Sequence, residues 1–290
     1  MRFRVSHTTA YAYSAPCSVS HTELHLTPHD GANQKTLEHD VVIEPKPDVS
    51  ATRLDYFGNA VTYFLIQEPH ESLTIKARSR VEVEVTAPIQ PALTPSWEQV
   101  RDEVRRHGTD ETFDAFQFVL ESPRVTLGSA FADYAARSFT RGKPLLEAVS
   151  NLGHRINRDF EYDPRATTVA TPVNQVLESR QGVCQDFAHL MIAALRSIGL
   201  PARYVSGYLR SAEKTLGAEA SHAWVSVFCQ GFGWLDFDPT NDLMPRGEHV
   251  TIARGRDYSD VPPVKGVAVG GGSQTVEVGV EVVPEFPSVN

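Results

Sequence analysis

Over about the first 90 residues, apolar and polar positions alternate along the chain with the period of two that is typical of β-strands. The alternation is longest at 3–13 and 73–85, and shorter patterns lie at 23–27, 37–43 and 61–66. Turn-forming residues separate these patterns at 28–31, 45–48 and 57–59. Alternating strands joined by regular turns predict an antiparallel sandwich or barrel-like sheet.

The middle of the chain changes to the helical spacing of about 3.6 residues. Prolines within 87–95 indicate a linker. Helical patterns then lie at 97–107, 112–120, 130–139 and 145–160. Further on, Thr171 and Pro172 predict an N-cap and a first helical position, which open a short helix to about Arg180.

Strand patterns return in the last third of the chain. They lie at 203–209, 222–228 and 233–240, and a last alternating run covers 276–282 after a glycine turn at 270–272. The polar loop Ser211–Ala220 lies before the second of these strands. An antiparallel β region, followed by helices and then by more strands, indicates the α+β class.

One stretch, Gly182–Ala188, places a cysteine where a helix begins. The stretch runs into an apolar stripe with helical spacing, which comprises Phe187, Met191, Ala194, Leu195 and Ile198. Gly199 is predicted to end this helix. Cys184 therefore falls in the first turn, where the helix dipole and the free N–H groups stabilise a thiolate, the nucleophilic form of cysteine. A buried structural cysteine is the alternative that this stretch alone leaves open.

Composition and charge narrow the classes of function. With 41% hydrophobic and 22% charged residues, the chain is typical of a globular protein, and its net charge of −9 argues against a nucleic-acid partner. Three scattered cysteines make neither a disulfide framework nor a CxxC zinc pair, which fits a reducing cytoplasm. We expect no signal peptide and no membrane partner, since no apolar run approaches the ~20 residues of a membrane span.

A cysteine nucleophile needs a base, and the base needs an orienting group. His222 begins one predicted strand, and Asp238 lies near the end of the next. If Gly231 is the left-handed residue of a three-residue hairpin loop, the paired residue numbers sum to 460. Asp238 then falls opposite His222, at roughly 5 Å between Cβ atoms, and Asp236 falls opposite Trp224. A structural histidine and a turn-forming aspartate are the alternatives. The register match of Asp238 to His222, together with a cysteine at the start of a helix, favours a Cys184–His222–Asp238 site.

The remaining histidines do not have such a setting. His189 follows Cys184 by five residues, so it points to a different face of the helix and is expected to pack. In the N-terminal β region, His7, His21, His25 and His29 show no ligand-like clustering. We therefore expect no metal site and no cofactor.

These residues together resemble the transglutaminase-like core, whose fold is related to that of papain-like cysteine peptidases. The resemblance lies in Gly182-Val183-Cys184, His222-Ala223-Trp224 and the run from Trp234 to Thr240, in that order. The N-terminal β region, the Asp55–Asn59 turn and the Gly255–Tyr258 segment resemble bacterial transglutaminase-like proteins that have their own N-terminal domain. The resemblance implies a β-rich domain at 1–93, a catalytic core of helices followed by an antiparallel sheet at 94–256, and a β tail at 257–290 that packs on the rest.

The resemblance also implies roles for single residues. The family's nucleophile carries over to Cys184, its base to His222 and its acidic orienting residue to Asp238. The backbone N–H of Cys184 is the expected first oxyanion donor, and Gln181 and Tyr162 are candidates for the second. Trp224 and Trp234 are candidates for the walls of the substrate channel, although core packing is the simpler interpretation of Trp224.

One departure from the family limits what carries over. Animal transglutaminases have Gln-Cys-Trp at the nucleophile, whereas this chain has Val183-Cys184-Gln185 and lacks their calcium-binding and β-barrel extensions. Calcium activation and protein cross-linking therefore do not carry over. We expect a bacterial cysteine protease or amidase that hydrolyses amide, peptide or isopeptide bonds of a peptide or protein substrate through a thioester.

Two other functions stay open, as does the oligomeric state. One is acyl transfer to amines of the protein-glutamine gamma-glutamyltransferase type, and the other is a non-catalytic binding or scaffold module. The intact Cys, His and Asp argue against the scaffold. The polar loop Ser211–Ala220, if it lies at the mouth of the site, would leave a thioester in contact with water and favour hydrolysis over transfer.

Overall fold

The structure is a computed structural model that describes residues 1–210, 216 and 221–285. Apart from residue 216, the predicted polar loop Ser211–Ala220 lies outside the described residues, so its placement at the mouth of the site stays a prediction. Within the described residues, no helix has both the length and the apolar character to cross a membrane.

The N-terminal sheet is built around one long strand, β1 (Arg2–Leu24). The other strands of this region are β2 (Gln34–Glu44), β3 (Val49–Leu54), β4 (Ala60–Ile66) and β5 (His70–Val83). The first half of β1 pairs with β5, and its last residues pair with β4, with an irregularity between Ala12 and Cys17. The two halves of β1 therefore belong to two different groups of strands.

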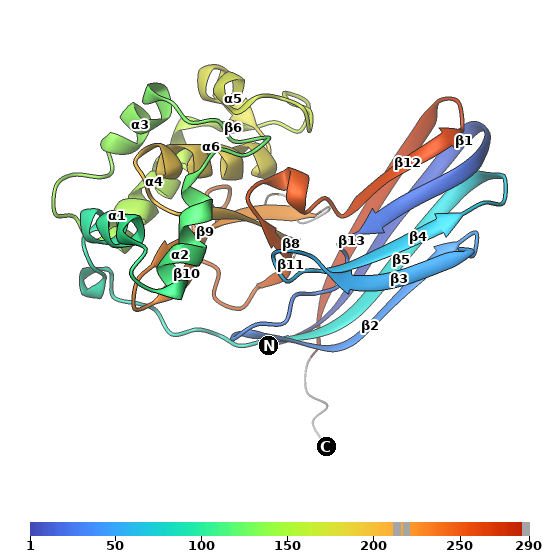
Figure 1. The fold of residues 1–290 in the computed structure, drawn as a ribbon, viewed down its shortest axis with the longest axis horizontal. Coiled ribbons are helices and arrows are strands. Elements are labelled where there is room, and N and C mark those ends of the chain that lie inside the picture. Colours follow the sequence, from blue (N-terminus) through green and yellow to red (C-terminus); the bar gives the residue numbers. More distant parts are fainter. Residues whose placement is uncertain (211–215, 217–220, 286–290) are drawn as a thin grey trace.

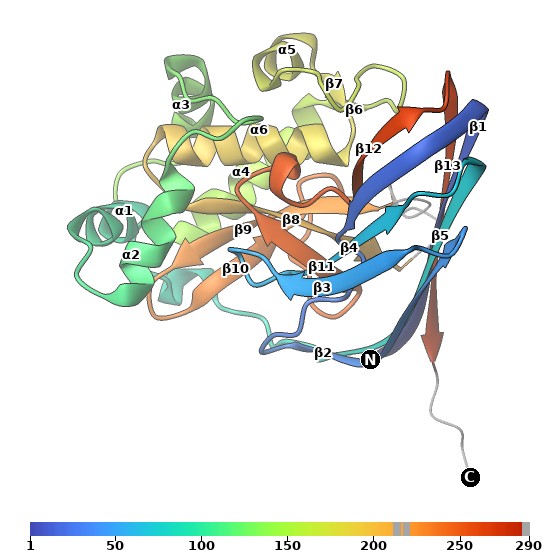
Figure 2. The same ribbon diagram turned by 45° about the vertical axis from the view of Figure 1, so that its right-hand side comes forward.

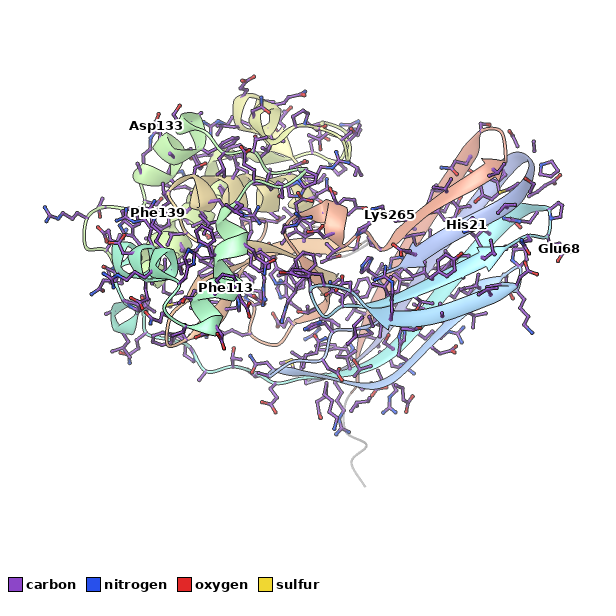
Figure 3. All side chains as sticks on the ribbon, in the orientation of Figure 1. His21, Glu68, Phe113, Asp133, Phe139 and Lys265 are labelled. Atoms are coloured by element: carbon purple, nitrogen blue, oxygen red, sulfur yellow. The ribbon has the colours of Figure 1, made fainter. Side chains whose placement is uncertain are left out.

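The C-terminal tail completes the same sheet. A hairpin of β12 (Val264–Gly270) and β13 (Gln274–Glu285) turns through three glycines with positive φ, Gly270, Gly271 and Gly272. The β12 strand pairs with the last residues of β1, and β13 pairs with its first half. Figure 1 shows β12 and β13 beside β1, and Figure 3 labels Lys265 and His21 on the paired strands β12 and β1. All seven strands form one antiparallel sheet.

The two groups of strands enclose a small core of their own. Its buried members are Leu24, Leu26, Phe64, Ile66, Leu73, Ile75 and Ala77. They come from both halves of the folded sheet, which agrees with the predicted antiparallel β domain. Two details of the prediction were wrong: 23–27 is not a separate strand, since its first two residues end β1 and the other three lie outside any strand, and β3 was not predicted. Every residue of β3 is exposed, so no buried face imposes the alternation that marks a strand.

Helices fill the middle of the chain. They are α1 (Trp97–Arg106), α2 (Asp110–Phe116), α3 (Ser129–Ala136), α4 (Leu145–Asp159), α5 (Val173–Ser179) and α6 (Cys184–Ser197), with short 3₁₀ turns η1 (Pro91–Leu93) and η2 (Gln117–Val119). The helix predicted at 112–120 thus ends at Phe116 and continues as η2. The predicted N-cap was also one residue early: Pro172 takes that place, and the Thr171 hydroxyl accepts from the Thr168 N–H instead.

The second sheet has four antiparallel strands in the order β10-β9-β8-β11. They are β8 (Ala202–Leu209), β9 (His222–Cys229), β10 (Gly233–Phe237) and β11 (His249–Gly255), and a 3₁₀ turn η3 (Tyr258–Asp260) follows them. A short parallel pair, β6 (Glu161–Tyr162) and β7 (Gln181–Gly182), precedes α6. Helix α6 packs on β8 and β9 and also contacts α3 and α5, so it is enclosed between helices and sheet (Figure 2).

Buried contacts join the N-terminal sheet to this core. The Nδ1 atom of His7 on β1 lies 2.8 Å from the Tyr208 hydroxyl on β8. At the tip of the β3–β4 hairpin, the Asn59 amide donates to the Arg254 carbonyl and accepts from the Arg254 N–H, both at 2.8 Å. The tip is thus docked on β11, and the two parts of the chain share one large hydrophobic cluster.

Candidate active site

Cys184 is the first residue of α6, as its sequence context predicts. Val183 before it is extended, and the Asp186 carboxylate in the first turn accepts from the Val183 N–H at 2.9 Å. The Thr167 hydroxyl donates to the same oxygen at 2.6 Å, which ties the loop before α5 to the start of α6. Cys184 keeps 8% of its surface exposed, so its sulfur lies at the edge of the core and at the positive end of a helix.

His222 and Asp238 meet next to this cysteine. The Nε2–H of His222 donates to Asp238 Oδ2 at 2.8 Å, and both side chains are fully buried. Burial alone would lower the pKa of His222, but the charge and hydrogen bond of Asp238, with a further contribution from Cys184, raise it from 6.5 to about 10. Because Nε2 is engaged by Asp238, Nδ1 is the ring nitrogen left for the thiol. Nδ1 is buried and makes no other hydrogen bond with the described residues.

The contact between His222 and Asp238 is the predicted one, but the predicted register is wrong. Gly233 pairs with Cys229 and Phe237 with Val225, so paired numbers sum to 462 and not to 460. The loop consists of residues 230–232, because the Phe232 N–H donates to the Cys229 carbonyl. Continuing this register, Asp238 falls opposite Trp224 and is a diagonal neighbour of His222. The sum stays even, so Asp238 keeps the predicted face of the sheet.

Asp238 lies just after β10, in a turn closed by two backbone hydrogen bonds with Leu243. Its Oδ1 accepts from the backbone N–H groups of Thr240 and Asn241, and its Oδ2 accepts from His222, from the Asn241 side chain at 2.9 Å and from His249 at 3.1 Å. Burial would raise the pKa of Asp238, but the charges and hydrogen bonds of the two histidines outweigh it and hold that pKa well below its usual range.

His249 was missed by sequence reasoning. It begins β11, pairs with Leu209, and is only 5% exposed. No local motif marks it, since it reaches Asp238 only because β11 lies beside β8 in the sheet. Its ring packs edge-on against Trp224, at 5.0 Å between centroids.

Three groups of the metal-binding type therefore converge. The ligand atoms of His222, Asp238 and His249 all lie within 4.8 Å of one another. This cluster of three was not found from the sequence, because only the spacing of histidines along the chain was considered. The N–O distances of 2.8 and 3.1 Å are those of hydrogen bonds, with the imidazole protons directed at the carboxylate.

The other predicted site residues are placed as follows. Trp224 is completely buried and lies roughly parallel to the His222 ring, at 6.2 Å between centroids. Trp234 is half-buried on β10, packs against Phe118 and Phe228, and lines a cavity of about 230 Å³ with the linker. Their roles as channel walls stay predictions.

The two candidates for the second oxyanion donor lie in the β6–β7 pair before α6. The Gln181 amide donates to the Glu161 carboxylate at 3.1 Å. Tyr162 pairs with Gly182 through the backbone, and its ring meets that of Phe187 at 6.4 Å. Gln181 thus lies three residues before Cys184, and Tyr162 pairs with Gly182, two residues before it.

A further tyrosine lies near the cysteine. Tyr204 on β8 is buried. Its burial and, as a smaller cause, the charge of the nearby Cys184 raise its pKa well above 10.0.

The other two cysteines have different surroundings from Cys184. Cys17 is fully buried, and burial raises the pKa of Cys229 from 9.0 to about 11.

Two stretches of the chain match family models. Residues 3–82 match the bacterial transglutaminase-like N-terminal region, and residues 132–239 match the transglutaminase-like superfamily. The second match includes Cys184, His222 and Asp238.

Two mycobacterial proteins are similar to nearly the whole chain, and an enzyme is similar to part of it. An uncharacterised protein of Mycobacterium tuberculosis is 41% identical over 297 residues, which is 98% of this chain and 93% of that protein. One of Mycobacterium leprae is 32% identical, with 97% and 98% covered. A protein-glutamine gamma-glutamyltransferase of Pseudomonas aeruginosa is 33% identical over 121 residues, which is 36% of this chain and 18% of that enzyme.

A solved structure shares the whole fold. The crystal structure of a protein from Cytophaga hutchinsonii, described there as a candidate cysteine protease, superposes with a TM-score of 0.77 at 22% identity. The match covers 99% of this chain and 92% of that one. At this identity the likeness concerns the fold.

Proposed function

The chain belongs to the transglutaminase-like superfamily, and from this premise we propose that it is a cysteine-dependent hydrolase of amide, peptide or isopeptide bonds. Cys184 is the nucleophile, His222 the base and Asp238 the group that orients the base. The substrate is a peptide or protein, and neither metal nor organic cofactor takes part.

One observation carries the proposal. The Nε2–H of His222 donates to Asp238, so the imidazole turns Nδ1 toward a cysteine at the first residue of a helix. The raised pKa of His222 favours the imidazolium, and an imidazolium beside a thiol at a helix N-terminus favours the thiolate. Orientation by a buried carboxylate fixes the tautomer, which is the role of the acid in triads generally.

The reaction then runs in two halves. His222 takes the thiol proton, the sulfur lone pair of Cys184 attacks the amide carbonyl, and the carbonyl electrons move onto oxygen. The Cys184 N–H has no acceptor inside the helix, so it is free to donate to this oxyanion. Gln181 and Tyr162 remain candidates for a second donor. His222 next protonates the leaving amine as the C–N bond breaks, which leaves a thioester.

Water resolves the thioester in our proposal. His222 takes a proton from water, hydroxide adds to the thioester carbonyl, and the C–S bond breaks to release the acid and the thiolate. Water is present at about 55 M, so an amine can compete only through a site that raises its effective concentration. No motif of such a site stands in this sequence.

Acyl transfer to an amine is the second candidate. The Pseudomonas aeruginosa relative favours it, since its name assigns transfer from protein glutamine to that enzyme. The match covers only 36% of this chain and 18% of that enzyme, so we rank it below hydrolysis.

The test is a competition between water and an amine. Wild type is incubated with glutamine- and peptide-based acyl donors and a millimolar primary amine, and the products are weighed by mass spectrometry. We expect the free acid to dominate and Cys184→Ala to form neither product. A dominant amine adduct would make the protein a transferase, and no turnover of any donor by the folded protein would favour the scaffold.

A further inference from the structure

The carboxylate that orients His222 is itself held by a second histidine. His222 Nε2 and His249 Nε2 approach the same atom, Asp238 Oδ2, at 2.8 and 3.1 Å. A carboxylate oxygen without a proton only accepts, so each of these nitrogens carries a proton and donates it. Asp238 therefore stands between two imidazoles that come from β9 and β11.

We propose that His249 is a positioning residue for the reaction: its hydrogen bond fixes Asp238 Oδ2 in the orientation that keeps His222 Nδ1 directed at the Cys184 thiol. This inference rests on the proposed function and adds a residue that acts through Asp238, without touching the substrate. Asp238 sits at the end of β10, in a turn, where a backbone alone holds a side chain less firmly than mid-strand.

The rings around Asp238 have little freedom. Trp224 stacks on His222 and meets His249 edge-on, and the two histidine rings lie 6.0 Å apart between centroids. All three side chains are nearly or completely buried. Rotation of the carboxylate would break two hydrogen bonds at once in a site shielded from water, where unpaired polar groups are costly.

Without the second imidazole, Oδ2 would keep His222 and the Asn241 amide as donors, and the carboxylate could turn toward Asn241. The bond to His222 would weaken, the imidazolium would lose stabilisation, and the thiolate would lose its counter-charge. Among the described residues, the titratable groups at this cluster are Asp238, the two histidines, Cys184 from α6 and, beside the cysteine, Tyr204 from β8. The pH range over which a Cys184 thiolate and a His222 imidazolium coexist should therefore become narrower, and its acid limit should rise.

The test measures the rate of Cys184 alkylation by iodoacetamide as a function of pH, which needs no substrate. His249→Leu removes the donor, His249→Gln keeps an N–H donor at a similar reach, and Thr251→Val is the matched control two residues along the same strand. In His249→Leu, we expect the acid limb of the pH–rate profile to move up by about one pH unit or more. In the Gln and Val variants it should stay where the wild type has it. Should the Leu variant not fold, His249→Met replaces it, because methionine fills irregular space without a donor.

Two results would overturn the inference. If the acid limbs of the pH–rate profiles coincide in wild type and in the variant without a donor, the hydrogen bond from His249 does not position Asp238. Equal shifts in the Leu and Gln variants would assign the effect to ring packing and not to the hydrogen bond. Failure of the proposed function is a separate result, since it would be seen as a wild-type protein with a reactive Cys184 and no turnover.

Discussion

Gly207 on β8 lies directly opposite His222 on β9, and the ring of Trp224 occupies the space that a side chain at this glycine would need. A Cβ atom at Gly207 would come within 2.5 Å of Trp224 Cη2 and still closer to the Val250 carbonyl. The stacked rings of the candidate site thus depend on a missing side chain in the neighbouring strand.

Gly207→Ala should therefore damage the site and the fold together. The Val250 carbonyl belongs to the sheet backbone and cannot give way cheaply, so we expect a loss of about 1–3 kcal/mol in the free energy of unfolding, as for overpacked cores. Turnover should fall as well, because Trp224 can shift only against His222 or His249. Urea denaturation and initial rates measure both. Gly279→Ala on β13 is the control, since a Cβ there meets nothing within 4 Å; equal behaviour of the two variants would contradict the expectation.

Cys184 should be the cysteine that reacts first with an electrophile. It combines a helix start with a nearby imidazolium, whereas Cys17 is fully buried and the pKa of Cys229 is raised to about 11 by burial. Brief treatment with iodoacetamide near neutral pH, followed by peptide mapping, measures the order of labelling. Earlier labelling of either other cysteine would refute the thiolate argument.

Asp238 and Asp236 should differ sharply in their importance for turnover. Asp238→Asn keeps the shape but removes the charge that fixes the His222 tautomer, and we expect a loss of roughly 10³–10⁴ in kcat. Asp236 on β10 pairs with Ser226 on β9, away from the position of Asp238, so Asp236→Asn should cost less than about tenfold. Steady-state kinetics with a peptide-based acyl donor decide between them, with circular dichroism to confirm folding. The reverse ranking would show that the acid is wrongly assigned.

Stability should fall between about pH 7 and pH 10 in a manner that depends on His222. Its pKa is raised to about 10 in the folded protein, so the folded state keeps a proton that the unfolded chain loses near 6.5. The stabilisation is fully present below about pH 6.5 and is lost as pH rises through about 10, with a slope of at most about 1.4 kcal/mol per pH unit. Urea unfolding of wild type and His222→Gln near pH 6, 8 and 10 measures it. The free energies of unfolding of wild type and His222→Gln should approach each other as pH rises. A difference between them that stays constant with pH would speak against the raised pKa.

Chelators should leave the activity unchanged. The proposed chemistry uses a thiolate and needs no metal-activated water. Added Zn²⁺ should instead inhibit, because His222, Asp238 and His249 offer it a set of ligands and Cys184 lies nearby. Rates after dialysis against EDTA, with a reducing agent present, provide the measurement. Activity that is lost in EDTA and returns with a metal, but not with a reducing agent, would reverse the assignment.

The parts of the site that could be predicted from the sequence are those set by local periodicity. The stripe that starts at Phe187 fixes a helix, and the helix fixes Cys184 at its first turn. The hairpin brought His222 and Asp238 together although the register was wrong by two, since an even error leaves a side chain on the same face. A slip of one residue would have separated the pair.

What could not be predicted depends on pairings between distant segments. His249 reaches Asp238 because β11 lies next to β8, and no spacing along the chain encodes that neighbour. The exposed strand β3 shows no pattern, because neither face is buried. The roles of Gln181 and Tyr162 as oxyanion donors stay predictions, because they would depend on side-chain orientation in the short β6–β7 pair, for which periodicity gives no information.

The pairing of β1 with β13 also has a consequence for biosynthesis. Arg2 lies opposite Glu285 and Tyr13 opposite Gln274, so β1 leaves the ribosome long before its partner strand β13 is made. Until then one edge of β1 carries unpaired N–H and C=O groups, which is the kind of edge that recruits other chains. The helices and the second sheet are made in between and can collapse around α6 first. A nascent chain stalled before β12 should therefore hold a formed Cys184 helix beside an open, aggregation-prone sheet, and should depend on chaperones more than the finished protein does.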